Sequence, residues 1–197
     1  MNIAKRIAHL IAGTLVWGYE SGFFLSCAAG KPVNKRLEAI PWWPYPLIEW
    51  LDRCPLEGKN ILEFGSGQST LYFDRRGAKI ESYEHNFEWA KYVSSELYLE
   101  GQVIAVDSLP AGIKPLRTSY DMIIVDSINR RACLELASRM ISADGTIIAD
   151  DTGSWDLGML PEFKRTNFTG MRPAYSLKTT ATLFSRKAPE KIETTST

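Results

Sequence analysis

The segment from Asn60 to Thr70 constrains the fold more than any other part of the chain, because it predicts a buried strand, a sharp turn and a helix in direct succession. Its apolar start suits a strand of a parallel sheet. Gly65 and Gly67 let the chain turn and let its backbone approach a ligand closely. The polar residues that follow begin a helix whose first N–H groups have no partner within the helix. This pattern is typical of a loop that binds a nucleotide-type cofactor.

Two features separate this loop from the dinucleotide-binding fingerprint. Glu63 precedes the first glycine, and Ser69 and Thr70 occupy the region of the third glycine. With them, the sequence Glu-Phe-Gly-Ser-Gly-Gln-Ser-Thr resembles the first motif of the class I S-adenosylmethionine-dependent methyltransferases, in particular a subset of small bacterial members. The resemblance implies an α/β, Rossmann-like methyltransferase fold with a seven-stranded, mostly parallel sheet and an antiparallel C-terminal hairpin.

The resemblance also assigns a site for S-adenosylmethionine to this sequence. Glu63 would hold the amino group of the methionine part, directly or through water, and Asp107 at the end of the third strand would hold the adenine amino group. The full set of cofactor-binding residues that we expect is Glu63, Gly65, Ser66, Gly67, Ser69, Thr70, Glu84, His85, Asp107 and Asp126.

A second predicted strand, from Lys79 to Glu84, ends in an acid about 20 residues after Gly65. A carboxylate at this spacing can accept hydrogen bonds from both hydroxyls of a ribose, and it would serve NAD equally well. The alternative is an acid that is stabilised by the dipole of the next helix. His85 has two open roles, packing against the adenine or acting as a catalytic base.

Three further acids follow predicted buried strands. Asp126 ends one apolar run, and Asp150 and Asp151 end the next one. Since the carboxyl ends of parallel strands share one edge of a sheet, we expect these acids beside the cofactor loop. They resemble the acids of metal-dependent small-molecule O-methyltransferases, which implies a Mg²⁺ site made by all three. Without a metal, Asp126 or Asp151 is the expected general base, Asp151 alternatively caps the next helix, and Arg130 balances the acids.

The charge balance and the cysteines bear on partners and location. Basic and acidic residues number 23 each, and no basic run exceeds a pair, which argues against nucleic acid and favours a small-molecule substrate. Cys27, Cys54 and Cys133 lie far apart without the spacing of a metal or redox site, so we expect reduced thiols in a cytoplasmic protein. The oligomeric state stays open, with a homodimer as one option.

We divide the chain into a helical and aromatic cap segment over residues 1–58, a cofactor-binding catalytic domain over residues 59–186 and a disordered tail over residues 187–197. Apolar residues from Ile3 to Leu15 recur at helical spacing with basic residues opposite, which predicts an amphipathic helix that covers the domain. A signal peptide and loose attachment to a membrane surface are the alternatives. Because Glu20 interrupts the apolar stretch before it can span a bilayer, we expect no membrane partner.

Trp42, Trp43 and Tyr45 lie in a proline-rich stretch ahead of a short helix predicted from Leu47 to Asp52. Their flat apolar faces suit the wall of a substrate pocket, or they pack the N-terminal segment onto the sheet. A similar Pro-Trp-x-x-Tyr-Pro segment precedes the glycine motif in the bacterial subset named above.

The rest of the chain alternates helices and strands, which predicts a parallel sheet that is covered on both faces. We expect helices over residues 68–75, 87–100 and 129–141, strands over 80–84 and 102–106, a poor helix over 155–164, and two antiparallel strands over 165–170 and 179–185. Residues 108–119 are too few for the helix usually found there, which leaves the adenine side of the pocket open.

The function that this resemblance implies is transfer of a methyl group from S-adenosylmethionine to an oxygen, or less readily a nitrogen, of a small molecule. Two other classes remain. One is a non-catalytic module that binds a cofactor or a partner on the same fold. The other is an NAD-dependent oxidoreductase, which the missing third glycine and the C-terminal hairpin disfavour.

Overall fold

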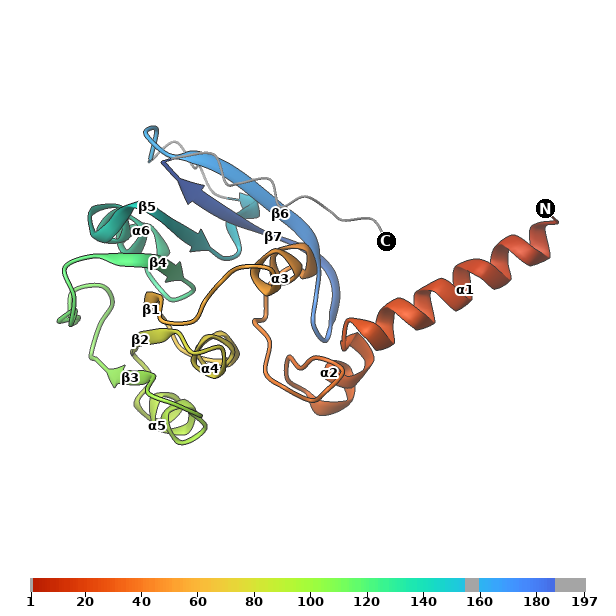
Figure 1. Cartoon of the computed structure of the whole chain (residues 1–197), viewed down its shortest axis with the longest axis horizontal. Coiled ribbons are helices and arrows are strands. Elements are labelled where there is room, and N and C mark those ends of the chain that lie inside the picture. Colours follow the sequence, from red (N-terminus) through yellow and green to blue (C-terminus); the bar gives the residue numbers. More distant parts are fainter. Residues whose placement is uncertain (1, 155–159, 187–197) are drawn as a thin grey trace.

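The structure is a computed structural model that describes residues 2–154 and 160–186. Its strands are β1 (Asn60–Phe64), β2 (Lys79–Glu84), β3 (Gln102–Ala105), β4 (Tyr120–Val125), β5 (Ile141–Ala149), β6 (Lys164–Arg172) and β7 (Tyr175–Ser185). They form one seven-stranded sheet in the order β3-β2-β1-β4-β5-β7-β6 (Figure 1). Strands β1 to β5 pair in parallel, and β7 runs antiparallel to β5 and β6. The predicted sheet and its C-terminal hairpin are therefore confirmed.

Helices α3 (Tyr45–Asp52) and α4 (Gln68–Arg75) pack on one face of the parallel part of the sheet, and α6 (Arg130–Met140) packs on the other. The remaining helices are α1 (Ile3–Glu20), α2 (Phe23–Ala29), α5 (Phe87–Ser95) and the short 3-10 helix η1 (Thr152–Ser154). Successive strand residues point to opposite faces. Ile61 of β1 packs in the cluster that holds α3 and α4, whereas Leu62 packs in the cluster that holds α6. The continuous apolar runs of β1 and β4 follow from this burial on both sides.

Helix α5 is shorter than the sequence predicted, because it ends at Ser95 instead of continuing to residue 100. The buried carboxylate of Asp74 in α4 accepts hydrogen bonds from the backbone N–H groups of Tyr98 at 2.6 Å, Leu99 at 2.9 Å and Gly101 at 2.8 Å. These N–H groups would otherwise continue the helix. Asp74, which is distant in the sequence, thus fixes the segment between the end of α5 and the start of β3.

Two connections bear on earlier predictions. Residues 106–119 join β3 to β4 through turns without a helix, as the short spacing predicted. The buried carboxylate of Glu81 in β2 holds this connection through the N–H group of Leu116 at 2.8 Å.

The hairpin strands β6 and β7 are longer than predicted and meet at Arg172 and Tyr175. Half of the expected poor helix, residues 155–159, and the expected tail, residues 187–197, lie outside the described residues.

The N-terminal segment contains the predicted amphipathic helix, but this helix does not cover the domain. Helix α1 projects away from the sheet, and the N-terminus lies at its far tip (Figure 1). Its apolar side chains are exposed, with 70 % of the Leu10 surface and 55 % of the Ile11 surface accessible. Only the last turns pack on the molecule, where the Trp17 ring lies 5.7 Å from Phe23 and 5.3 Å from Tyr45. The expectation of a covering helix was wrong because helical periodicity does not specify what the apolar face contacts.

None of the helices in the described part of the chain combines the length and apolarity needed to span a lipid bilayer.

Candidate functional site

The glycine loop lies at the carboxyl edge of β1, where it meets the end of β4. Gly65 has a φ of +93°, and a Cβ atom on it would lie 2.2 Å from the backbone oxygen of Asp126. The N–H group of Asp126 in turn donates to the Phe64 oxygen at 3.0 Å. Glycine is therefore required at residue 65 for both conformation and space. At Gly67 a Cβ atom would meet only the Trp89 ring, at 3.9 Å, so this side of the loop is open.

Glu63 is enclosed rather than open to the loop, with 1 % of its surface accessible. Its carboxylate accepts hydrogen bonds from the hydroxyls of Ser69 at 2.5 Å, Thr70 at 2.6 Å and Ser82. Burial outweighs these three donors and raises the pKa of Glu63 to about 7.

This network also fixes the loop. Thr70 accepts a hydrogen bond from the N–H group of Gly67 at 2.9 Å, so Glu63 is connected to the glycine backbone through one hydroxyl. The acid and the Ser-Thr pair of the sequence motif thus form a single structural unit that ties β1, β2 and α4 together. A contact between Glu63 and the methionine amino group stays a prediction.

Glu84 ends β2 directly beside the loop and is 5 % exposed. Its Oε2 accepts from the Ser66 N–H group at 2.9 Å and the Ser66 hydroxyl at 3.3 Å, and its Oε1 accepts from the Asn86 N–H group at 2.8 Å. His85 Nδ1 lies 3.0 Å from Oε1. Asp107 is exposed in the connection after β3. The structure therefore places Glu84, His85 and Asp107 at one edge, after β2 and β3.

The three carboxylates that were expected to bind Mg²⁺ do not assemble into a metal site. Asp126 Oδ1 accepts from Arg130 at 3.1 Å, and its Oδ2 accepts from the indole N–H of Trp43 at 3.1 Å. Asp150 is buried, whereas Asp151 is exposed and has a φ of +58°. Across the described residues, no group of three or more His, Cys, Asp or Glu side chains could hold a metal ion. The magnesium prediction therefore gains no support from the described residues, where Arg130 places a positive charge beside Asp126.

Asp150 nevertheless lies beside Asp126, since its N–H group donates to the Val125 oxygen at 3.1 Å. Burial, and second the charge of Asp126, raise the pKa of Asp150 well above its ordinary value. Within the described chain, its Oδ1 is buried without a hydrogen-bond partner. A carboxyl group with a raised pKa beside an arginine-paired carboxyl group can hold and pass a proton.

A cavity of about 200 Å³ joins the glycine loop to the N-terminal segment. The loop contributes one wall and Asp126 lies at the end of β4. The opposite wall comes from the residues that follow α2 and from Trp42, which is 43 % exposed. The lining residues are Gly30, Lys31, Pro32, Trp42, Ser66, Gly67, Gln68, Ser69, Trp89 and Asp126.

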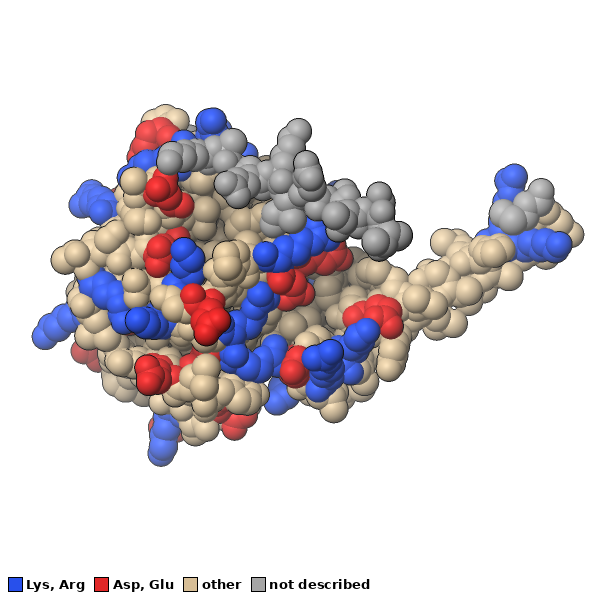
Figure 2. Space-filling model, viewed as in Figure 1, with Lys and Arg blue, Asp and Glu red and all other residues tan. Residues whose placement is uncertain are grey.

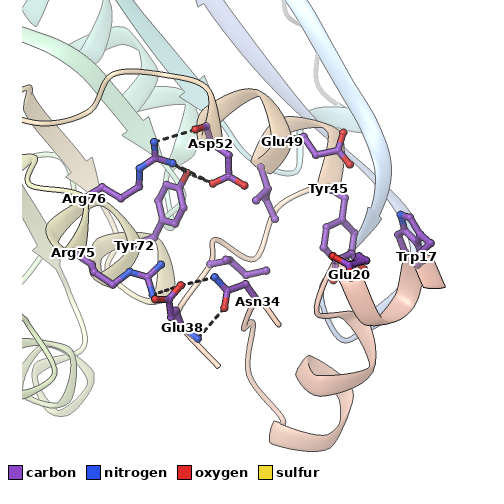
Figure 3. Close-up of a pocket in the computed structure, with 13 residues that line it drawn as sticks. Trp17, Glu20, Asn34, Glu38, Tyr45, Glu49, Asp52, Tyr72, Arg75 and Arg76 are labelled. Carbon is purple, nitrogen blue, oxygen red and sulfur yellow. Dashed lines mark hydrogen bonds and ion pairs between the residues drawn. The ribbon is translucent and has the colours of Figure 1, made fainter. Parts of the chain in front are cut away.

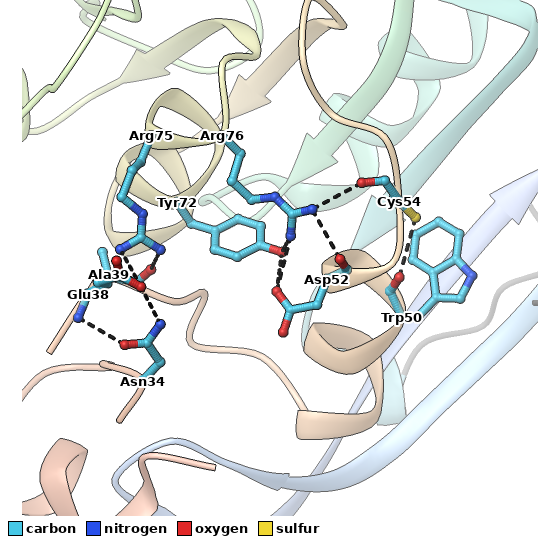
Figure 4. A network of polar contacts seen from close by, with 9 residues as sticks. All are labelled: Asn34, Glu38, Ala39, Trp50, Asp52, Cys54, Tyr72, Arg75 and Arg76. Atoms are coloured by element: carbon cyan, nitrogen blue, oxygen red, sulfur yellow. Dashed lines mark hydrogen bonds and ion pairs between the residues drawn. The ribbon is translucent and has the colours of Figure 1, made fainter. Parts of the chain in front are cut away.

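A larger cavity of about 490 Å³ lies away from the glycine loop, between the N-terminal segment, α3 and α4 (Figure 3). Both of its arginines are already paired with acids. Arg75 contacts Glu38 at 3.3 Å, and Arg76 contacts Asp52 at 3.1 Å (Figure 4). Arg76 also donates to the Tyr72 hydroxyl at 2.6 Å. We interpret this region as the joint that fixes the N-terminal segment to α4, and the smaller cavity at the glycine loop as the candidate site.

Trp89 had no signal in the sequence, and the sequence predicted a pocket wall or packing role for Trp42, Trp43 and Tyr45 without assigning one role to each. The Trp89 indole N–H donates to the Ser66 oxygen at 2.7 Å and closes one side of the cavity. The three aromatic residues of the proline-rich stretch have different roles. Trp42 lines the cavity, Trp43 binds Asp126 and Tyr45 packs against Trp17. These contacts join segments that are distant in the chain, so the spacing of residues in the sequence does not predict them.

Several solved structures share this fold at low sequence identity. A candidate caffeoyl-CoA O-methyltransferase from Staphylococcus aureus matches with a TM-score of 0.57 and 16% identity, over 93% of this chain and 100% of that chain. A candidate O-methyltransferase from Klebsiella pneumoniae matches with a TM-score of 0.51 and 18% identity, over 86% and 90%. A TehB-like S-adenosylmethionine-dependent methyltransferase from Corynebacterium glutamicum matches with a TM-score of 0.51 and 18% identity, over 72% and 86%.

No protein-family model matches the sequence, and no curated protein matches it. The similarity to these proteins therefore lies in the fold itself, with its strand order, its C-terminal hairpin and its glycine loop at the end of β1. This chain has the fold of the class I S-adenosylmethionine-dependent methyltransferases.

Proposed function

We propose that the chain transfers a methyl group from S-adenosylmethionine to an oxygen of a small molecule. The observation that carries the proposal is the cavity at the glycine loop, which brings the open side of Gly67 and the carboxylate of Asp126 together. The names of the Staphylococcus and Klebsiella structures support oxygen as the acceptor. A nitrogen acceptor is the second option.

The residues of the loop edge suit this cofactor. Gly65 and Gly67 admit it, and Glu84 receives its ribose. We expect a ribose hydroxyl to displace the Ser66 hydroxyl from Glu84, because that contact, at 3.3 Å, is the longest of the three hydrogen bonds to this carboxylate. Asp107 binds the adenine amino group, and His85 packs beside the ribose and adenine rather than serving as the base. Bound S-adenosylmethionine would supply a methyl group on a positively charged sulfur, already a strong electrophile.

The remaining task of the chain is to orient the acceptor and to take its proton. Positioning of the reacting groups provides most of the rate in such a displacement. Both oxygens of Asp126 are fixed, one by Arg130 and one by Trp43, so this carboxylate has a defined direction at the cavity. We assign Asp126 as the residue that orients the acceptor hydroxyl and receives its proton, with Asp150 as its neighbour in proton transfer and Asp151 as the weaker candidate.

The N-terminal segment contributes the acceptor side of the cavity. Trp42 and the residues from Gly30 to Pro32 face the glycine loop across it. Substitution Trp42→Ala is therefore expected to raise the KM for the methyl acceptor while the Kd for S-adenosylmethionine changes little. Equal losses in both constants would show that Trp42 supports the cofactor instead.

The proposal is tested in two steps with the full chain. Calorimetry with S-adenosylmethionine, S-adenosylhomocysteine and NADH should give binding for the first two only. Mass spectrometry of a panel of hydroxylated and aminated small molecules should then detect addition of a methyl group, and Asp126→Asn should reduce kcat more than cofactor affinity. Chelation of divalent cations should leave the activity unchanged.

The same measurements separate the alternatives. Binding of S-adenosylhomocysteine without transfer to any acceptor of the panel would favour the non-catalytic module. Binding of NADH in its place would favour an oxidoreductase and would overturn the proposal.

A further inference from the structure

Helix α1 carries a large apolar surface that nothing in the described chain covers. Its exposed large apolar side chains are Ile3, Ile7, Leu10, Ile11, Leu15 and Val16, with exposed fractions from 52 % to 73 %. In the view of Figure 2 the helix extends beyond the body of the molecule as an almost uncharged rod with basic groups at its tip. A monomeric soluble domain rarely exposes contiguous apolar surface of this extent.

The apolar residues are not spread evenly around the helix. At about 100° per residue, Ile3, Ile7, Leu10, Ile11 and Leu15 share one side. Lys5, Arg6 and His9 lie on the opposite side. A helix of 18 residues is about 27 Å long, so this side forms one continuous stripe.

The charges of α1 indicate what the stripe contacts. From Ile3 to Tyr19 the sequence contains no acidic residue, and Glu20 at the base of the helix is already paired with Lys35. A second α1 packed on this stripe would offer no carboxylate to Lys5 and Arg6 along those residues. An anionic surface would satisfy both the apolar stripe and these two cations at once.

We propose that α1 binds the surface of an anionic lipid bilayer, lying in the interfacial plane with its apolar stripe among the acyl chains. The helix does not meet the requirements for spanning the bilayer, which agrees with this orientation. Trp17 and Tyr45 anchor the base of α1 to α3, so binding would hold the domain at the membrane. This inference does not depend on the proposed methyl transfer.

The test is co-sedimentation of the full chain with phosphatidylcholine vesicles, with and without phosphatidylglycerol. We expect binding to the anionic vesicles that weakens roughly tenfold or more on phosphatidylcholine alone, since Lys5 and Arg6 are attracted to anionic headgroups. The paired substitution Leu10→Gln and Ile11→Gln should weaken binding roughly tenfold or more while keeping good helix formers in α1.

Two controls make the outcome decisive. Leu37→Gln changes a side chain that is 65 % exposed outside α1 and should leave vesicle binding unchanged. Lys5→Glu with Arg6→Glu should abolish the preference for phosphatidylglycerol. The inference is overturned if the chain binds neither kind of vesicle, if Leu10→Gln with Ile11→Gln binds as the parent does, or if light scattering shows an α1-dependent dimer that does not bind lipid.

Discussion

The glycine-loop edge and helix α1 differ in where their side chains find interaction partners. At the loop edge, the buried carboxylates of Glu63 and Glu84 have hydrogen-bond partners within the chain, as the three hydroxyls around Glu63 illustrate. On α1, apolar groups are exposed and have no partner within the described chain. Contacts within the chain determine the conformation of the loop edge, whereas local helix propensity determines the conformation of α1.

The difference distinguishes a region with one fixed geometry from a region that is available to bind an external partner. Buried polar networks that are fully satisfied define one geometry, because every departure leaves a group unpaired. An exposed amphipathic helix gains little stability from packing on the rest of the chain, and it gains much more when its apolar side enters an external apolar phase. Four predictions test this contrast, from the largest expected effect to the smallest.

The substitution Gly65→Ala should be the most damaging. It places a methyl group 2.2 Å from the Asp126 oxygen at a φ of +93°, so we expect a loss of roughly 3 to 4 kcal/mol in the free energy of unfolding and no binding of S-adenosylhomocysteine. Urea unfolding and calorimetry measure both effects. Gly67→Ala is the matched control, because its added methyl group meets only Trp89, at 3.9 Å, and should leave stability within about 0.5 kcal/mol. Equal stability of the two variants would contradict the assigned geometry.

The second prediction concerns pH. The folded-state pKa of Glu63 is raised from 4.5 to about 7, so between these values the native state binds more protons than the unfolded state. The free energy of unfolding should therefore fall as the pH rises from about 5 to 8, by roughly 3 kcal/mol from this residue.

Glu63→Gln keeps the shape and removes the ionisation, so it should flatten this slope over the same window. Because Asp150 also has a raised pKa, Asp150→Asn serves as the parallel variant and should reduce the slope over a pH window that includes that of Glu63. Urea unfolding at closely spaced pH values measures both slopes. A parent curve that rises between pH 5 and 8 would show that the hydroxyl donors outweigh burial at Glu63.

Third, Glu84→Ala should weaken binding of S-adenosylhomocysteine by about 1.5 to 3 kcal/mol, or roughly tenfold to a hundredfold, because it removes the acceptor of the ribose hydroxyls. The same change also releases the N–H groups of Ser66 and Asn86, so calorimetry must be paired with a thermal melt. Glu84→Gln retains one acceptor oxygen and should fall between the parent and Glu84→Ala. An unchanged affinity in a folded Glu84→Ala protein removes the ribose assignment.

The smallest effect is expected on α1. Ile11→Ala should change the free energy of unfolding by less than about 0.5 kcal/mol in the absence of lipid, since Ile11 is 55 % exposed and alanine favours the helix. The matched substitution Ile48→Ala in α3, where Ile48 is 4 % exposed, should cost about 2 to 4 kcal/mol. If Ile11→Ala costs as much as Ile48→Ala, α1 packs against the chain in solution and the contrast is lost.

Much of the fold could be predicted from the sequence, because the relevant signals are local. The bounds of α4, Gln68–Arg75, agree with the expected range, since a glycine loop and an arginine-bearing last turn mark its ends. The early end of α5 could not be predicted, because it depends on Asp74, a residue of another helix that captures N–H groups of the chain following α5.

The candidate site divides in the same way. Sequence placed Glu84, Asp126 and Asp150 at one edge of the sheet, because parallel strands end together. It offered either a metal or Arg130 as the partner of these acids, but it did not reveal that Trp43 binds the second oxygen of Asp126. Partner choice among converging charges depends on side-chain positions to within an ångström, and residue spacing does not contain that information.

The sequence by itself therefore determined the order of helices and strands, the glycine loop and the amphipathic character of α1. Periodicity, glycine conformation and charge act within a few residues of the chain. The tertiary structure alone decided that Glu63 is enclosed, that Trp43 binds the second oxygen of Asp126, and that α1 stands clear of the sheet. Burial and pairing are properties of contacts between segments far apart in sequence, so they arise only when the sheet brings those segments together.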